Sequence, residues 1–267
     1  MVKLKRFGQK LYLALVILFL YAPIFVLVGL SFNSSKSRSK WGGFTTKWYR
    51  SMFSNDTILA ALRDTLIIAL LSALFATLLG TVAAIGINRM KKLPRAMMLG
   101  VTNIPMLNAE IVTGISLMLL FLALKLELGF WTVLLSHTSF NVPYVILSVL
   151  PKLKQTNRST YEAALDLGAK PLRAFFAVVL PDIFPGVLSG FLLAFTLSLD
   201  DFIITHFTRG NSVSTLSTLI YSETRKGIKP EMYALSTLLF VSVLVLLIFI
   251  NRAGAKQEKK RLQQNAA

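Results

Sequence analysis

Residues 65–87 read TLIIALLSALFATLLGTVAAIGI, an apolar run without a charged side chain. A helix of about 20 mainly apolar residues is long enough to cross the hydrocarbon core of a bilayer. The run ends at a basic turn, NRMKKLPR, which occupies residues 88–95. We therefore predict that residues 65–87 form a membrane-spanning helix.

Five further runs are long and apolar enough to span a membrane: residues 11–32, 96–124, 131–150, 183–207 and 232–250. The third span, residues 96–124, is interrupted by Pro105, Asn108 and Glu110, so we expect a kink or a local unwinding there. Such breaks are tolerated in a bilayer only where protein or a water-filled cavity covers them. The sequence predicts an all-α, polytopic membrane protein with six transmembrane helices in a single domain, residues 1–267.

The composition agrees with a membrane protein, because 54% of the 267 residues are hydrophobic and only 15% are charged, against about 25% in soluble domains. The net charge of +17 would otherwise suggest nucleic acid. However, 18 of the 29 Lys and Arg residues lie on one side of the predicted spans: before residue 11, in 89–95, in 152–173 and in the tail 251–267. By the positive-inside rule, both termini are expected in the cytoplasm, and no nucleic-acid partner is needed.

Several kinds of chemistry are not expected in this chain. It contains no cysteine, and His137 and His206 lie far apart without metal-ligand spacing, so we predict no metal site. A Gly-rich phosphate loop and a nucleophile elbow are also missing from the sequence. We therefore expect a non-enzymatic chain without its own cofactor, and any ATP that drives it must be hydrolysed by another chain.

The longest cytoplasmic loop carries signals for two short helices. Ser159 and Glu162 have the spacing of a capping box at a helix start. Gly168 suits the left-handed residue that ends a helix. A second helix is expected over residues 173–180, with Pro181 as its stop.

The same loop, residues 151–181, resembles the "EAA" signature of ABC-importer permeases, with Val178 in place of the usual Ile. The matching positions are Glu162, Ala163, Ala164, Gly168, Leu180 and Pro181. In that family the segment is the coupling helix, which docks in a groove of the cytoplasmic ATPase. The resemblance implies that the two alanines allow close seating and that Gly168 permits the sharp turn.

Three more stretches are similar to the spermidine/putrescine permeases of the C-type subunit: NSS at 33–35, GFTTKWY at 43–49 and SLDDFIIT at 198–205. The resemblance implies a type I ABC importer permease fold in the bacterial inner membrane, surrounded by lipid. The implied partners are a second homologous permease, two ATPase subunits that bind ATP and Mg, and a periplasmic polyamine-binding protein. The alternatives are a permease of this fold for another cargo, such as iron or thiamine, and a secondary transporter that works without ATP.

Polyamine ammonium groups require carboxylates, oxygen ligands and aromatic faces. Ionisable residues at membrane depth are functional candidates, which selects Glu110, Asp200 and Asp201, with Ser198 beside the pair. Adjacent helical residues point about 100° apart, so only one Asp is expected to face the pathway. The alternatives are a solvated helix end for the Asp pair, compensation of freed backbone amides for Glu110, and helix packing for Ser198.

Two aromatic residues complete the predicted substrate pathway. Trp48 lies on an expected short amphipathic helix, residues 46–53, in an outer loop, and Tyr21 lies beside a proline in the first span. The alternative for Trp48 is anchoring at the membrane interface, which is common for Trp and Tyr. The alternative for Tyr21 is packing against lipid or another helix.

Overall fold

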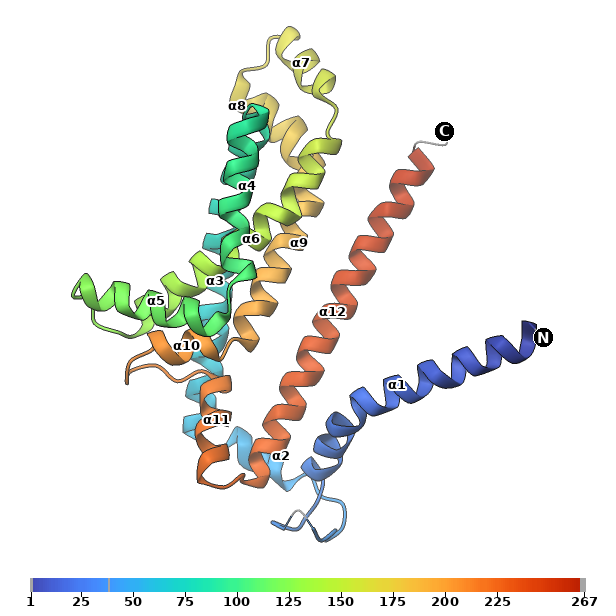
Figure 1. The fold of residues 1–267 in the computed structure, drawn as a ribbon, viewed down its shortest axis with the longest axis vertical. Helices are drawn as coiled ribbons and strands as arrows, with labels where there is room; N and C mark the ends of the chain where they lie inside the picture. The colour runs from blue at the N-terminus through green and yellow to red at the C-terminus, as the bar shows by residue number, and fades with distance from the viewer. Residues whose placement is uncertain (1, 38, 265–267) are drawn as a thin grey trace. The chain divides into compact units, whose positions relative to one another are not determined.

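The computed structural model describes residues 2–37 and 39–264, and its elements in these ranges are helices, with one isolated β-bridge between Asn33 and Phe44 (Figure 1). The helices are α1 (Val2–Ser31), α2 (Lys47–Phe53), α3 (Asp56–Arg89), α4 (Lys92–Leu107), α5 (Glu110–Ala123), α6 (Phe130–Gln155), α7 (Arg158–Asp166), α8 (Pro171–Ala174), the π-helical turn η1 (Phe175–Val179), α9 (Leu180–Asp200), α10 (Ile203–Thr208), α11 (Leu216–Lys226) and α12 (Pro230–Gln264). The predicted all-helical class is confirmed.

Four helices in the described part of the chain are long and apolar enough to cross a membrane. They are α1 from Lys10, α3, α6 and the continuous helix from Pro171 to Asp200. Helices α4 and α5 form a fifth candidate that is bent by 102° at its break. Helix α12 contributes a shorter apolar stretch, Pro230–Val245.

The chain divides into two compact units. The first contains Met1–Leu59 and Leu219–Leu244, and the second contains Ala60–Thr218 and Val245–Ala267. The single domain expected from the sequence therefore stays a prediction. The last three residues of the basic tail lie outside the described residues.

Helix α6 forms the centre of the second unit, because its faces pack against both α3 and α9 in one apolar cluster. Glycines allow this close approach. A Cβ at Gly80 of α3 would lie 2.7 Å from Val145 of α6, and a Cβ at Gly190 of α9 would lie 3.2 Å from the Val145 Cα. Small residues are the usual means by which membrane helices approach closely. Figure 1 shows α6 and α9 side by side, in agreement with their contacts.

The third predicted span is broken where the sequence indicated. Helix α4 ends at Leu107, Asn108 and Ala109 are extended, and α5 begins at Glu110. Pro105 lies inside α4, so the break follows the proline by one turn. The prediction of a kink or unwinding near the middle of this span is confirmed.

The fifth span differs from the prediction in two respects. Pro181 does not stop a helix, because the chain continues from α8 through η1 into α9. A wider π-helical turn, in which the Leu180 N–H bonds to the Phe175 carbonyl, ends at Val179, two residues before the proline. This local widening of the helix lets the chain continue past a residue that has no N–H to donate. The predicted end of the span is also wrong, since α9 stops at Asp200 and a separate helix, α10, begins at Ile203.

In the first unit, the loop between α1 and α2 is organised by Asn33. Its Oδ1 accepts bonds from the Ser35 and Gly42 N–H groups at 3.1 and 2.8 Å, and its Nδ2 donates to the Lys40 carbonyl at 2.9 Å. The predicted amphipathic helix over 46–53 is confirmed as α2, which follows Thr46.

Candidate functional site

The two helix breaks of the second unit lie close together, because α5 packs against α10. A Cβ at Gly114 of α5 would lie 3.1 Å from the Phe207 ring and 3.5 Å from the Ile203 carbonyl oxygen. Glu110 begins α5 one turn before Gly114, and Asp200 ends α9 three residues before Ile203. The fold thus gathers the candidate acids of two predicted spans around one contact.

Asp201 occupies the break between α9 and α10 and points into the protein, where its side chain is only 7% exposed. Its Oδ2 accepts the N–H of Thr205 at 2.8 Å, and its Oδ1 accepts the N–H of Ile204 at 3.3 Å. These are two of the amides that a helix start leaves without a partner inside the helix. Asp201 therefore supports the start of α10.

The inward side of this break contains a buried polar cluster centred on His137 of α6. The His137 Nδ1 lies 2.6 Å from the Ser198 Oγ, and the Nε2 lies 2.8 Å from the Thr205 Oγ1 and 3.2 Å from the Asp201 Oδ2. Ser72 of α3 donates to the Ser198 Oγ at 3.0 Å. The cluster joins α3, α6, α9 and α10, and its members are buried.

The cluster contains a Ser–His–Asp set, but it lacks what a hydrolase needs. Ser198 is 5% exposed and His137 is 2% exposed, so a substrate carbonyl has no access to the serine oxygen. Ser198 bonds to a helix neighbour, Ser72, from its other side. The arrangement holds helices together.

The neighbouring acids have the opposite environment. Asp200 and Glu110 are both exposed on the surface of this chain. The backbone carbonyl of Asp200 accepts a bond from the Ser217 Oγ at 3.5 Å, which leaves its carboxylate outside that contact. The structure thus separates the Asp pair into one inward and one outward carboxylate.

The predicted aromatic residues belong to the first unit. Trp48 is buried, its Nε1 donates to the Asn33 carbonyl at 2.7 Å, and the Lys47 Nζ lies 4.3 Å from its ring centroid. Tyr21 is exposed on α1. The roles of both residues in a substrate pathway stay predictions.

The predicted coupling segment begins differently from the expectation. The capping box of Ser159 and Glu162 does not form, because α7 starts at Arg158 and Asn157 is its N-cap. The Asn157 side chain accepts the Ser159 N–H at 3.0 Å, which provides the N-terminal cap two residues before Ser159.

The end of α7 agrees with the sequence. Gly168 has a φ of +85°, and its N–H bonds to the Leu165 carbonyl at 2.9 Å while the Ala169 N–H bonds to the Ala164 carbonyl at 3.1 Å. This pair of bonds is a Schellman motif, which requires a left-handed residue at the position of Gly168.

The surface of this segment is unusually apolar for an exposed turn. Leu167 is 90% exposed and Leu172 is 74% exposed. The remaining positions of the signature lie on or near this surface: Glu162, Ala163 and Pro181 are exposed, and Ala164 and Leu180 are half-buried.

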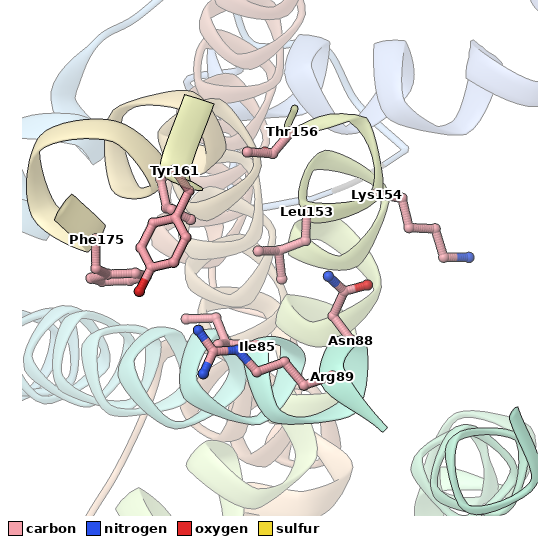
Figure 2. A pocket seen from close by; sticks show the side chains of 9 residues that line it. Ile85, Asn88, Arg89, Leu153, Lys154, Thr156, Tyr161 and Phe175 are labelled. Atoms are coloured by element: carbon pink, nitrogen blue, oxygen red, sulfur yellow. The ribbon is translucent and has the colours of Figure 1, made fainter. Parts of the chain in front are cut away.

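A pocket of about 800 Å³ lies between this segment and the ends of α3 and α6. Tyr161 of α7 and Phe175 of η1 line one side, and Arg89 of α3 lines the other (Figure 2). In Figure 2 the Arg89 guanidinium points toward the two rings, whereas Lys154 of α6 points away. The predicted coupling segment is thus separated from the ends of α3 and α6 by this pocket.

The sequence pattern of the family "Binding-protein-dependent transport system inner membrane component" matches residues 76–261. The chain belongs to this family. As a member, it is a multi-pass inner membrane component of a transport system, in agreement with its apolar helices.

Two curated relatives of this permease come from Escherichia coli (strain K12). It is 40% identical to the spermidine/putrescine transport system permease protein PotC over 230 residues, which are 86% of this chain and 87% of that protein. It is 39% identical to the putrescine transport system permease protein PotI over 253 residues, which are 92% of this chain and 90% of that protein.

Solved structures with the same fold are more distant in sequence. A bacterial ABC transporter for import of the acidic polysaccharide alginate matches with a TM-score of 0.70 at 17% identity, over 96% of this permease and 97% of that chain. The methionine ABC transporter MetNI, in an inward-facing conformation, matches with a TM-score of 0.61 at 16% identity, over 76% and 98%. These similarities show the ABC importer permease fold.

Sequence reasoning missed three members of the buried cluster: His137, Thr205 and Ser72. His137 was considered only as a metal ligand, and the described residues contain no metal-binding group of three or more His, Cys, Asp or Glu. The available signal was its position, since an ionisable side chain in an apolar span needs a partner.

Proposed function

We propose that this permease moves polyamines inward across the inner membrane, and that Asp200 is a carboxylate that binds a cargo ammonium group. One observation carries the assignment to Asp200: of two adjacent acids at a helix break, Asp201 is folded into the protein and Asp200 is left exposed. The names of the relatives, which concern spermidine and putrescine, support the choice of cargo.

Glu110 is the second proposed cargo contact. It lies exposed at the start of α5, and α5 packs against α10, which follows the Asp pair. A linear polyamine carries ammonium groups at separate positions, so carboxylates at separate helix breaks match it better than two on one turn. Ser198, by contrast, is assigned to the buried cluster.

We propose that residues 151–181 transmit the conformational change that accompanies ATP hydrolysis in a partner ATPase to this permease. The exposed side chains of Leu167 and Leu172 support this role, because apolar side chains at an exposed turn are typical of a protein contact. ATP and Mg bind to that partner. Closure of the ATPase dimer draws the coupling segments together and drives alternating access.

The proposed assembly contains this permease, a second homologous permease, two ATPase subunits and a periplasmic polyamine-binding protein. A solved relative in fold is an alginate transporter in complex with a periplasmic protein. We also propose six spans, with the apolar part of α12 as the last and with both termini in the cytoplasm. Inward movement of a cation is then assisted by the membrane potential, by roughly 2.3 kcal/mol per charge at 100 mV.

The test is uptake of radiolabelled spermidine and putrescine by the complete complex in proteoliposomes with internal ATP. We expect saturable uptake, inhibited by unlabelled polyamine and unaffected by iron, thiamine or an organic anion. Asp200→Asn is expected to raise KM about tenfold, which corresponds to about 1.4 kcal/mol of binding. Glu127→Gln, a change at an exposed acid outside the breaks, is the matched control.

Three results would contradict the proposal. Uptake of iron or thiamine instead of polyamine would agree with the fold but reject polyamine as the cargo. A wild-type KM in Asp200→Asn would reject the role of the Asp200 carboxylate in cargo binding. Uptake that continues without ATPase subunits would favour a secondary transporter.

A further inference from the structure

With a neutral ring, the buried cluster around His137 fits one directed arrangement of protons. The Asp201 carboxylate only accepts, and the Thr205 hydroxyl lies 2.8 Å from its Oδ2, so this hydroxyl donates to Asp201. The Thr205 oxygen can then accept, and the atom that faces it at 2.8 Å is the His137 Nε2. The proton of a neutral imidazole therefore belongs on Nε2.

The other half of the cluster follows from this tautomer. With its proton on Nε2, His137 accepts at Nδ1, and the Ser198 hydroxyl 2.6 Å away is the donor. Ser198 then accepts from the Ser72 hydroxyl at 3.0 Å. Each hydroxyl and the ring donate once in the same direction, from Ser72 to Asp201.

We infer that His137 is a positioning residue, whose neutral, Nε2-protonated ring completes a directed chain of hydrogen bonds from Ser72 to Asp201 and so holds Asp201 inward and Asp200 outward. The inference rests on the proposed role of Asp200. His137 touches no cargo, because it is buried.

The chain of hydrogen bonds explains why the adjacent acids Asp200 and Asp201 have different orientations. Asp201 accepts two backbone amides and the Thr205 hydroxyl, and the His137 Nε2 lies 3.2 Å from its Oδ2, so both carboxylate oxygens have partners. Without the ring, Ser198 loses its acceptor and the Thr205 oxygen loses its donor, in a contact where both side chains are buried. The helix break between α9 and α10 then loses its contacts with His137 of α6. As a result, the side chain of Asp200, one residue before Asp201, is no longer held in one orientation.

The experiment is a double-mutant cycle on the complete complex in proteoliposomes. We measure the KM and Vmax of spermidine uptake for His137→Phe, which keeps a ring without nitrogens, in the wild-type and Asp200→Asn backgrounds. His137→Gln, which retains a donor and an acceptor, is the rescue variant. His206→Phe, the same change at an exposed histidine, is the control.

We expect His137→Phe to raise KM about tenfold with little change in Vmax, and to raise it less than about twofold in the Asp200→Asn background, because residues that are coupled through a shared backbone segment are not additive. His137→Gln should restore at least half of the change in log KM, and His206→Phe should behave as wild type. Equal effects of His137→Phe in both backgrounds would overturn the inference, as would a loss of Vmax alone.

Failure of the inference can be told apart from failure of the proposed function. If wild-type complex shows no saturable polyamine uptake, the proposed function fails first. If wild-type uptake is saturable and Asp200→Asn raises KM, an additive cycle rejects only the role of His137. If neither His137→Phe nor His137→Gln assembles with the partner subunits, His137 has only a structural role and the positioning role is rejected.

Discussion

The most direct prediction compares Asp201→Asn with Asp200→Asn, because the two changes are chemically identical and lie one residue apart. At position 201 the asparagine oxygen can occupy the place of Oδ2, next to the Thr205 N–H, the Thr205 hydroxyl and the His137 Nε2. Its NH2 group then takes the place of Oδ1 and faces the Ile204 N–H, which is also a donor. At position 200 the side chain is exposed. We therefore expect loss of stability only for Asp201→Asn.

The magnitude follows from the contacts. Three close contacts of Oδ2, with the Thr205 N–H, the Thr205 hydroxyl and the His137 Nε2, lose the carboxylate charge, at about 1 kcal/mol each, and the Ile204 amide loses its acceptor at about 1 kcal/mol more. Removal of a buried charge recovers part of this cost, so we expect a net loss of about 2–3 kcal/mol. By the scaling for domains of this size, the melting temperature falls by about 5–10 °C.

The assay is thermal unfolding of the purified complete complex, followed by intrinsic fluorescence, with uptake measured in parallel. Asp200→Asn should melt within about 2 °C of wild type and show the raised KM. Asp201→Asn should melt lower. Equal melting temperatures for the two variants, or a lower one for Asp200→Asn, would refute the division of roles between the acids.

Three further predictions concern other parts of the permease. Leu167→Asp should abolish co-purification of the ATPase without lowering the melting temperature, since the side chain is 90% exposed; unchanged co-purification would contradict the docking role. Gly80→Leu should prevent accumulation of the folded chain, because its Cβ would lie 2.7 Å from Val145, and normal membrane yield would argue against this helix contact. Trp48→Phe removes the 2.7 Å bond to the Asn33 carbonyl and should cost about 1 kcal/mol, measured as faster proteolysis of the loop between α1 and α2; an unchanged cleavage rate would contradict it.

Signals that depend on local sequence were reliable. Four of the six apolar runs overlap helices that are long and apolar enough to cross a membrane. Pro105, Asn108 and Glu110 predict the break between α4 and α5, because proline and polar residues inside an apolar run are visible in the sequence. The left-handed φ of Gly168 was also predictable, since a helix end of this geometry favours glycine.

Features that depend on the choice between local alternatives were not predictable. Both Asn157 and Ser159 are good N-cap residues, and spacing to Glu162 favoured the wrong one. Pro181 signals a helix stop in most contexts, but a π-helical turn before it lets the helix continue. Such choices are made by the packing of the whole segment.

The buried cluster could not be predicted, because it is assembled from four helices. Ser72, His137 and Ser198 are far apart in the sequence, and none has a local pattern that names its partner. Only the packing of α3 and α9 on α6 brings these side chains within hydrogen-bond distance. The adjacent acids at 200 and 201 were evident from the sequence, but their different orientations depend on this cluster.

The same arrangement limits how this permease can hold a polycation. If Asp201 is occupied by internal donors, the break contributes one free carboxylate, Asp200, and the second break contributes Glu110. A polyamine with three or more ammonium groups then has more positive charge than these two acids neutralise, so the remaining ligands must come from another subunit or from cation–π contacts.

Partial neutralisation of the cargo favours its release, since a cargo held by a full set of buried ion pairs would leave slowly. We therefore expect that the addition of a second acid near Asp200, by Phe202→Glu, lowers the KM for spermidine and also lowers Vmax. A lower KM with an unchanged Vmax would contradict this expectation, because it would show that cargo release does not limit transport.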